Sequence, residues 1–307
     1  MSYEAPPTRL ALGISLTLLA SFLFAIASAF VWLFRGKFDT IQIVFFQNLV
    51  SLICILPIAL RRGHHRIPSN YMRTHMARDV MGVSSYYLFF LTIRFLDLPN
   101  ATVLYNSSPF FVPLVWWFWK REKIAPHLWG AIIIGFIGVA VLMGVSSGMF
   151  QPGFVFGVLA AIASAIALCA LRILNLYEEP MTRTLFYYFV VGTLLTAPLA
   201  AAAWVKPTPI EWLYAVIIGV STAVGQILLT IAYRYGTASY LSPLSYTSII
   251  YAALIASIFF GQKLSPRFFI GAMLIVLGGT TTYLIKKKPT SLKTAFKSPK
   301  QPKQPPL

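Results

Sequence analysis

About ten apolar stretches, each long enough to cross a lipid bilayer as a helix, occupy most of this 307-residue chain. Hydrophobic residues make up 58% of the chain and charged residues only 11%. A soluble protein of this length cannot bury so much apolar surface, so lipid is the expected solvent. The stretches are continuous and do not alternate in short segments, which excludes a membrane β-barrel. The sequence therefore predicts an all-α integral membrane protein with ten transmembrane helices, at 11–34, 41–60, 78–96, 99–119, 128–146, 153–171, 184–204, 212–234, 239–260 and 267–285.

The second half of the chain repeats motifs of the first half in the same order. The segment EKIAP at 122–126 returns as QKLSP at 262–266. Because each half holds five helices, an odd number, the second half must lie in the membrane in the opposite direction. We expect two inverted five-helix repeats, at 11–146 and 153–285, an organisation that many secondary transporters share. Further matching positions are Arg94 with Arg234, Leu104 with Leu244, Ser108 with Ser248, Gly130 with Gly271, and Gly138 with Gly279.

Positive charge is distributed unevenly over the two sides of this arrangement. If the N-terminus is placed inside, the inner segments hold 19 of the 25 Lys and Arg residues. This bias predicts a multi-pass protein of the cell inner membrane with both termini in the cytoplasm. Residues 1–10 form a short cytoplasmic N-terminus, and the Lys- and Pro-rich tail at 286–307 is expected to be disordered. The basic loops are expected to contact anionic lipid headgroups, and no basic and aromatic platform outside the membrane indicates nucleic-acid binding.

The ten-helix pattern and its motifs resemble the drug/metabolite transporter superfamily, in particular its EamA-like branch. The resemblance rests on 122–126 with Gly130, on the run GFIGV at 135–139, and on 101–104 followed by Ser108-Pro109. It implies ten helices in two inverted repeats and transport of a small metabolite. A weaker resemblance, to S-adenosylmethionine uptake carriers of intracellular bacteria, rests on the surroundings of Gln47 and on the entry to the third helix. This sequence departs from the usual family pattern at Gln47, Ile249 and Gln262, where an arginine, a proline and a glutamate are common.

Polar side chains within the membrane are costly unless they meet a partner or a water-filled cavity, so they are the candidate site residues. The prolines of the fourth and ninth helices free backbone carbonyls, which predicts hinges beside a cavity. Interhelical hydrogen bonding and simple kinks are the structural alternatives. Expected substrate-binding residues are Gln47, Asn48, Tyr86, Tyr87, Tyr105, Asn106, Ser108, Gln226, Thr230, Tyr246, Ser248 and Tyr251, and expected hinges are Pro109, Pro113 and Pro243.

These features predict a secondary transporter that moves a small polar organic metabolite by alternating access. An amino acid or a derivative such as S-adenosylmethionine is the expected substrate. Asp79 is expected at the inner mouth of the third helix, and the lack of a carboxylate near the bilayer midplane favours a facilitator or exchanger. A proton-coupled exporter of amino acids or drugs is one alternative. An integral-membrane transferase is another, but the histidines lie in connections without acid, base or metal partners at useful spacings, so no enzyme activity, metal or cofactor is expected. Glycines on the fifth and tenth helices leave both a monomer and a dimer open.

Overall fold

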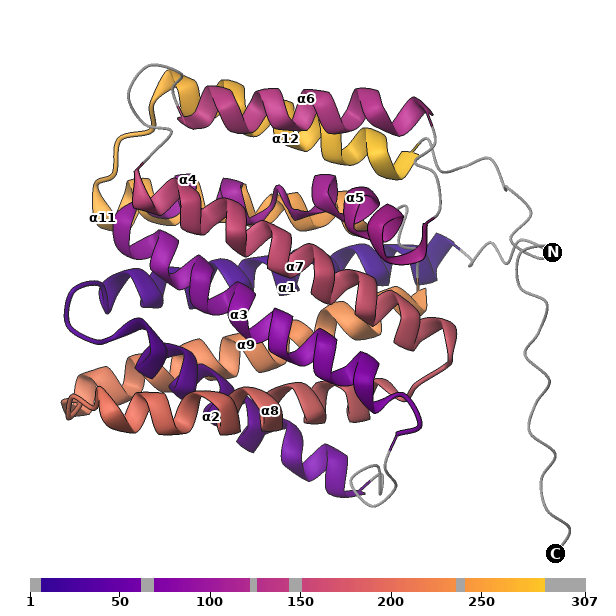
Figure 1. Cartoon of the computed structure of the whole chain (residues 1–307). Helices are drawn as coiled ribbons and strands as arrows, with labels where there is room; N and C mark the ends of the chain where they lie inside the picture. Colours follow the sequence, from indigo (N-terminus) through magenta and orange to yellow (C-terminus); the bar gives the residue numbers. More distant parts are fainter. Residues whose placement is uncertain (1–6, 62–68, 122–125, 144–150, 236–240, 285–307) are drawn as a thin grey trace, which may run out of the picture.

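The computed structural model describes residues 7–61, 69–121, 126–143, 151–235 and 241–284, and these ranges are almost entirely helical (Figure 1). The expected terminal segments and the N-terminal end of the ninth apolar stretch therefore lie wholly or partly outside the described residues. The elements of the first half are α1 (Pro7–Leu33), α2 (Thr40–Arg61), α3 (Met72–Phe95), α4 (Leu98–Tyr105), α5 (Ser108–Lys120) and α6 (Pro126–Met143). Those of the second half are α7 (Pro152–Leu176), α8 (Met181–Ala202), α9 (Pro209–Tyr235), the 3-10 helix η1 (Ser242–Tyr246), α11 (Thr247–Phe260) and α12 (Pro266–Leu284).

Each predicted apolar stretch overlaps one or two of these helices. Among the described residues, α1, α2, α7, α8 and α9 are long and apolar enough to cross a membrane by length and composition. The fourth stretch is not one helix, because it divides at Asn106-Ser107 into α4 and α5. The ninth stretch likewise consists of η1 followed by α11. Pro109 and Pro243 lie in the first turns of α5 and η1, where a missing backbone N–H costs no helical hydrogen bond.

The helices pack in pairs that join the two halves of the chain. α3 packs against α7, α1 against α9, α2 against α8, α4 against α11, and α6 against α12. Exchanging every element for its equivalent in the other half maps the α3–α7 pair onto the α1–α9 pair and leaves the α2–α8 and α6–α12 pairs unchanged. This is the contact pattern of two repeats related by a two-fold axis. In Figure 1, α6 and α12 lie side by side at one edge of the bundle, and α2 and α8 lie at the opposite edge.

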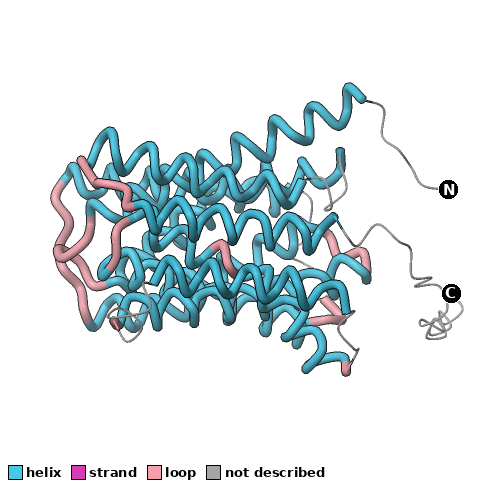
Figure 2. Tube along the Cα trace, turned by 90° about the horizontal axis from the view of Figure 1, so that it is seen from above, coloured by secondary structure: helices cyan, strands magenta, loops and turns pink. Residues whose placement is uncertain are grey.

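The connections gather at the two ends of the bundle, which Figure 2 shows from a second direction. The first described turn of α1 and the last turn of α12 lie at the same end (Figure 1). At the other end, α1 passes into α2 through a cluster of buried rings, in which Phe34 meets Phe38 edge to face at 4.9 Å between ring centroids. Phe90 of α3 and Tyr214 of α9 belong to the same cluster, so this end of the helix bundle is closed by aromatic packing.

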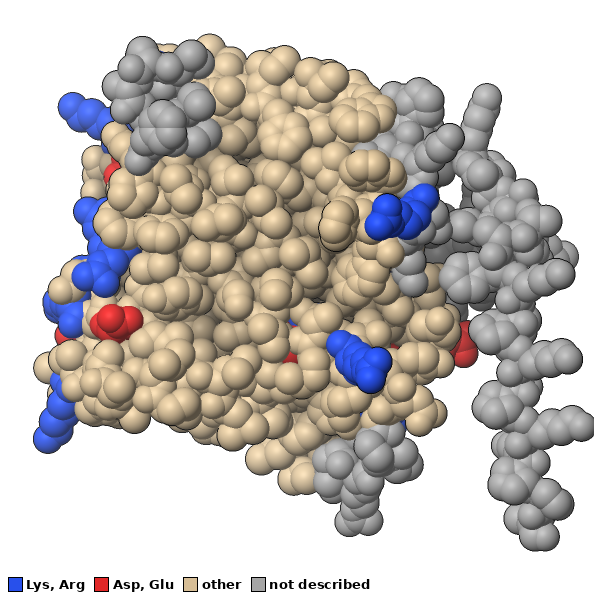
Figure 3. Space-filling view, viewed as in Figure 1, with Lys and Arg blue, Asp and Glu red and all other residues tan. Residues whose placement is uncertain are grey.

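Apolar side chains cover the sides of the bundle, whereas charged side chains lie mainly at its ends. On the face seen in Figure 3, a broad band between the two ends is almost free of Lys, Arg, Asp and Glu. Large apolar side chains point outward along the helices, among them Phe118 at 78%, Ile258 at 71% and Leu194 at 68% exposure. An exposed apolar surface of this extent is stable against hydrocarbon and not against water.

Candidate substrate cavity

A cavity of about 310 Å³ lies between the two halves of the bundle. Its walls come from α1, α3, α4, α5, α7, α8, α9, η1 and α11, so both repeats contribute to it. A volume of this size suits a small metabolite. The polar lining residues are Ser21, Ser28, Arg78, Ser85, Tyr86, Thr102, Tyr105, Asn106, Ser108, Ser164, Tyr188, Thr222, Gln226, Ser245, Tyr246 and Ser248.

The lining residues occur largely as equivalent pairs from the two repeats. Lining positions of α1 recur in the lining of α7 after 143 residues, and those of α3 to α5 recur in α9 to α11 after 140 residues. The pairs are Ser21 with Ser164, Phe24 with Ala167, Ala25 with Leu168, Ser28 with Leu171, Gly82 with Thr222, Tyr86 with Gln226, Phe89 with Leu229, Tyr105 with Ser245, Asn106 with Tyr246, and Ser108 with Ser248. The cavity therefore lies on the pseudo-two-fold axis.

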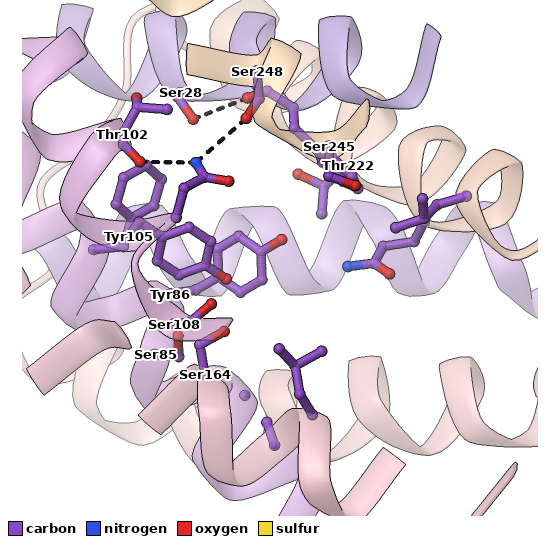
Figure 4. A pocket seen from close by; sticks show the side chains of 18 of the residues that line it. Ser28, Ser85, Tyr86, Thr102, Tyr105, Ser108, Ser164, Thr222, Ser245 and Ser248 are labelled. Atoms are coloured by element: carbon purple, nitrogen blue, oxygen red, sulfur yellow. Dashed lines mark hydrogen bonds between the residues drawn. The ribbon is translucent and has the colours of Figure 1, made fainter. Parts of the chain in front are cut away.

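Aromatic rings and hydroxyl groups share the centre of the cavity. The ring of Tyr105 lies 6.0 Å from that of Tyr86 and 4.5 Å from that of Phe89, measured between centroids. Figure 4 shows Ser85, Ser108 and Ser164 on one side of these tyrosines, with Thr102 and Ser248 on the other. Such a wall offers ring faces for stacking and hydroxyl groups for hydrogen bonding.

Asn106 connects the repeats at the break between α4 and α5. Its Nδ2 donates to the backbone oxygen of Thr102 at 2.8 Å and to Ser248 Oγ of α11 at 3.3 Å (Figure 4). The break leaves backbone groups without helical partners, and the short polar side chains of this segment satisfy some of them. Ser107, for example, donates to the backbone oxygen of Leu104 at 2.6 Å.

Several polar lining residues were not among the expected site residues, and Arg78 is the charged one among them, because the expected third helix began at residue 78. α3 begins at Met72, so Arg78 and Asp79 lie two turns inside the helix and are buried, with side-chain exposures of 8% and 0%. The sequence predicted Asp79 at the mouth of this helix, and that prediction was wrong. The Asp79 carboxylate is instead buried inside α3, next to the cavity residue Arg78. Arg78 Nη1 donates to Asp79 Oδ1 at 3.0 Å, and the guanidinium lies 4.1 Å from the centroid of the Tyr188 ring.

The structure places the other expected site residues outside the lining of this cavity. Gln47 is buried with Nε2 3.4 Å from Thr222 Oγ1, and Asn48 Nδ2 donates to the backbone oxygen of Val44 at 2.8 Å. Tyr251 packs edge to face against Phe22 with 5.4 Å between centroids. Four further expected site residues do not line the cavity. They are Tyr87 in α3, Thr230 in α9, Pro113 in α5 and Pro243 in η1.

A second group of charged side chains lies at the end of the bundle near the start of α3. Glu179, between α7 and α8, accepts hydrogen bonds from Ser69 and from Arg183, the latter at 3.1 Å. His75 Nε2 of α3 lies 3.8 Å from the same carboxylate. Among the described residues, no group of three His, Cys, Asp or Glu side chains is arranged to hold a metal ion.

The sequence matches the model of one protein family and is similar to several named transporters. The model of the EamA-like transporter family matches residues 11–144 and again residues 151–284. The pseudopaline exporter CntI of Pseudomonas aeruginosa is 27% identical over 86% of this chain and 93% of that protein.

Two further relatives are similar over comparable lengths. The S-adenosylmethionine uptake transporter of Rickettsia bellii is 27% identical over 84% of this chain and 88% of its own length. The riboflavin transporter of Brucella anthropi is 25% identical over 85% and 93%. A solved crystal structure that is 20% identical superimposes with a TM-score of 0.62, covers 92% of this chain and 98% of its own, and supports the fold alone.

Proposed function

The chain belongs to the EamA-like transporter family, as its motifs indicated, and we propose that it is a secondary transporter that moves a small polar organic metabolite by alternating access. The single observation that carries this proposal is the cavity on the pseudo-two-fold axis, lined by equivalent positions of the two repeats. A site built in this way can open to either side of a membrane if the two repeats exchange conformations.

One difference between equivalent contacts supports such an exchange. Tyr188 of α8 and Gln47 of α2 are equivalent, because they lie 141 residues apart in helices whose first residues are also 141 apart. Tyr188 packs on Gly82 and lines the cavity, whereas Gln47 packs on Thr222 and does not. In the state in which the two repeats have exchanged conformations, Gln47 lines the cavity and Tyr188 does not. The expected role of Gln47 thus belongs to the second state.

We place both termini in the cytoplasm of a cell whose inner membrane holds the protein. The common end of α1 and α12 and the excess of Lys and Arg in the expected inner segments support this orientation. With that orientation, Arg78, Leu171 and Tyr188 lie on the cytoplasmic side of the cavity, and the Phe34 cluster closes the outer side. The basic loops then contact anionic lipid headgroups of the inner leaflet.

The chemistry of the walls supports an amino acid or a derivative as the substrate. Stacking surfaces at Tyr86, Phe89 and Tyr105 suit a planar group, and the surrounding hydroxyl and amide groups suit a polar one. The names of the relatives give pseudopaline, S-adenosylmethionine and riboflavin as their solutes, which are all small metabolites.

Facilitated diffusion or exchange is the mode that the sequence favoured, but the burial of Asp79 supports a second candidate, a proton-coupled exporter. Asp79 Oδ2 has no hydrogen-bond partner among the described residues. A buried carboxylate beside a solute path is a suitable proton carrier. The two modes differ in one measurable respect, which is the response of solute flux to an imposed pH gradient.

Uptake into proteoliposomes tests the proposed function. The purified protein is reconstituted and offered radiolabelled amino acids, polyamines, nucleotides and S-adenosylmethionine, with and without a pH gradient. Saturable uptake of one class supports the transporter, and acceleration by the gradient selects the proton-coupled mode. Failure to move any compound, together with turnover of a bound lipid, would instead support the transferase.

A further inference from the structure

Arg78 is the charged side chain that lines the cavity in the described part of the chain. A guanidinium carries five N–H donors in a planar fork. Within the described residues, one hydrogen bond from Arg78 is found, the bond from Nη1 to Asp79 at 3.0 Å. Most of its donors are therefore available to a group inside the cavity. The pair formed with an adjacent residue leaves the outer edge of the fork free for a second, bidentate partner.

The buried position of this arginine requires a compensating negative charge. A cation in the interior of a membrane protein needs an anionic partner or water, and such residues usually mark a solute path. Asp79 supplies the negative charge from outside the cavity, since its side chain is fully buried and does not line the cavity. The face of the Tyr188 ring, 4.1 Å from the guanidinium carbon, supports the same cation from the side.

Gly82 allows Tyr188 to take this position. A methyl group at residue 82 would lie 2.8 Å from Tyr188 Cε2, which is closer than real side chains approach. Tyr188 is itself 3% exposed, so its ring cannot move aside without opening the packing between α3 and α8. The arginine fork is therefore held in place by a counter-ion and a ring, and its direction is set before a solute arrives.

We propose that Arg78 binds a carboxylate group of the transported metabolite, with Asp79 as the resident counter-ion that keeps this binding reversible. The proposal rests on the proposed function and narrows its substrate class to carboxylic acids and zwitterions. Along α3, the eight residues from Arg78 to Tyr86 span about 12 Å at ~1.5 Å per residue. A solute with a carboxylate at Arg78 thus places its other end among Tyr86, Tyr105 and Asn106.

Matched acids and amides test this assignment by binding. The wild-type protein in detergent is titrated with L-methionine, L-tryptophan and S-adenosylmethionine, each paired with its carboxamide, and ligand-induced thermal stabilisation is measured. We expect each binding acid to bind roughly tenfold to hundredfold more tightly than its amide, the range for hydrogen bonds to a charged group. Arg78→Gln is expected to abolish this difference, and Arg78→Lys to retain part of it. Arg94→Gln is the matched control, since Arg94 is exposed on the same helix and outside this cavity.

Asp79→Asn gives a readout that a purely structural ion pair does not. Removal of the competing charge is expected to tighten binding of the acid and to slow its turnover in proteoliposomes. Where Arg78→Gln fails to fold, Arg78→Lys and Asp79→Asn carry the test. Equal binding of acid and amide by the wild type, or no stabilisation by any acid, overturns the carboxylate site. Selective acid binding without flux keeps the site and overturns the transporter, whereas flux of amides and amines alone keeps the transporter and overturns the site.

Discussion

Lys37, between α1 and α2, forms an ion pair with Glu211 in the first turn of α9, with 3.4 Å between Nζ and Oε1. This contact joins the first repeat to the second at the end of the bundle that the Phe34 cluster closes. Gln42 reinforces it, because its Nε2 donates to the backbone oxygen of Val205 at 2.7 Å and its Oε1 accepts from Val205 N at 3.1 Å. The equivalent junction at the opposite end joins Glu179 to the start of α3. The two repeats are thus linked at both ends, and the proposed alternating access requires each link to open in turn.

We expect Lys37→Gln to favour the state that is open at the end of this ion pair. Gln47→Cys and Tyr188→Cys, each in a background without Cys54 and Cys169, report the two states by their labelling with a membrane-impermeant maleimide. Lys37→Gln should raise labelling at position 47 and lower it at position 188. The change is expected to stay within about fivefold, because Lys37 is 64% exposed and exposed pairs are weak.

Lys206→Gln is the control for this experiment, because it removes an exposed cation near the same end that forms no ion pair among the described residues. Glu179→Gln, at the other junction, should have the reverse effect of Lys37→Gln: labelling should fall at position 47 and rise at position 188. If labelling at positions 47 and 188 rises or falls together, the model in which the two repeats exchange conformations is contradicted.

Gly279→Ala is expected to destabilise the protein, because the hydroxyl of Tyr246 occupies the place of a side chain at residue 279. Overpacking of a buried contact costs about 1–3 kcal/mol, which should appear as a lower midpoint of thermal unfolding in detergent. Gly130→Ala is the matched control, since nothing lies within 4 Å of an added methyl group there. If both variants unfold at the same temperature, Tyr246 does not depend on this close approach.

Asn106 and Ser248 are expected to couple the two repeats energetically. Their hydrogen bond, at 3.3 Å, lies inside the bundle, where interhelical bonds average about 0.6 kcal/mol in double-mutant cycles. Asn106→Ala, Ser248→Ala and the double variant, measured by equilibrium unfolding, should give a coupling of this size. Asn106→Ala with Ser15→Ala is the control pair, because Ser15 donates within α1 to Ala11, and this pair should be additive. A cycle for Asn106 and Ser248 that closes without coupling would rule out the link.

Tyr105→Ala and Gln47→Ala should each reduce uptake while the protein remains folded. Tyr105 forms part of the cavity wall in the described state, and we assign Gln47 to the wall of the other state. We expect a loss of about tenfold for Tyr105→Ala, since stacking and a hydrogen bond are removed together. Uptake is measured at equal amounts of monodisperse protein. Undiminished transport by both variants would remove these residues from the site.

The sequence contained the membrane helices and the duplication, because both are written in local composition and in motifs that recur in order. Runs of about twenty apolar residues predict helices whatever the tertiary fold, and α1, α2, α7, α8 and α9 follow them closely. The cluster at Tyr105, Asn106 and Ser108 was also predicted from its polarity alone, and it lines the cavity. The breaks between α4 and α5 and before α11 were visible only as prolines, since a proline permits both a kink and a new helix start.

Tertiary structure decided which polar residues meet. The rotation of each helix about its axis follows from its neighbours, as when Gly82 admits the ring of Tyr188 from a helix about a hundred residues later. The guanidinium of Arg78 lies against the ring of Tyr188, whereas Gln47, the equivalent of Tyr188, contacts Thr222. The sequence contains the residues that differ, Gly82 against Thr222 and Tyr188 against Gln47, but it does not show that they meet, because these contacts join helices far apart in the chain. Composition therefore determined that the chain spans a membrane in two similar halves, and packing determined where a solute can be held between them.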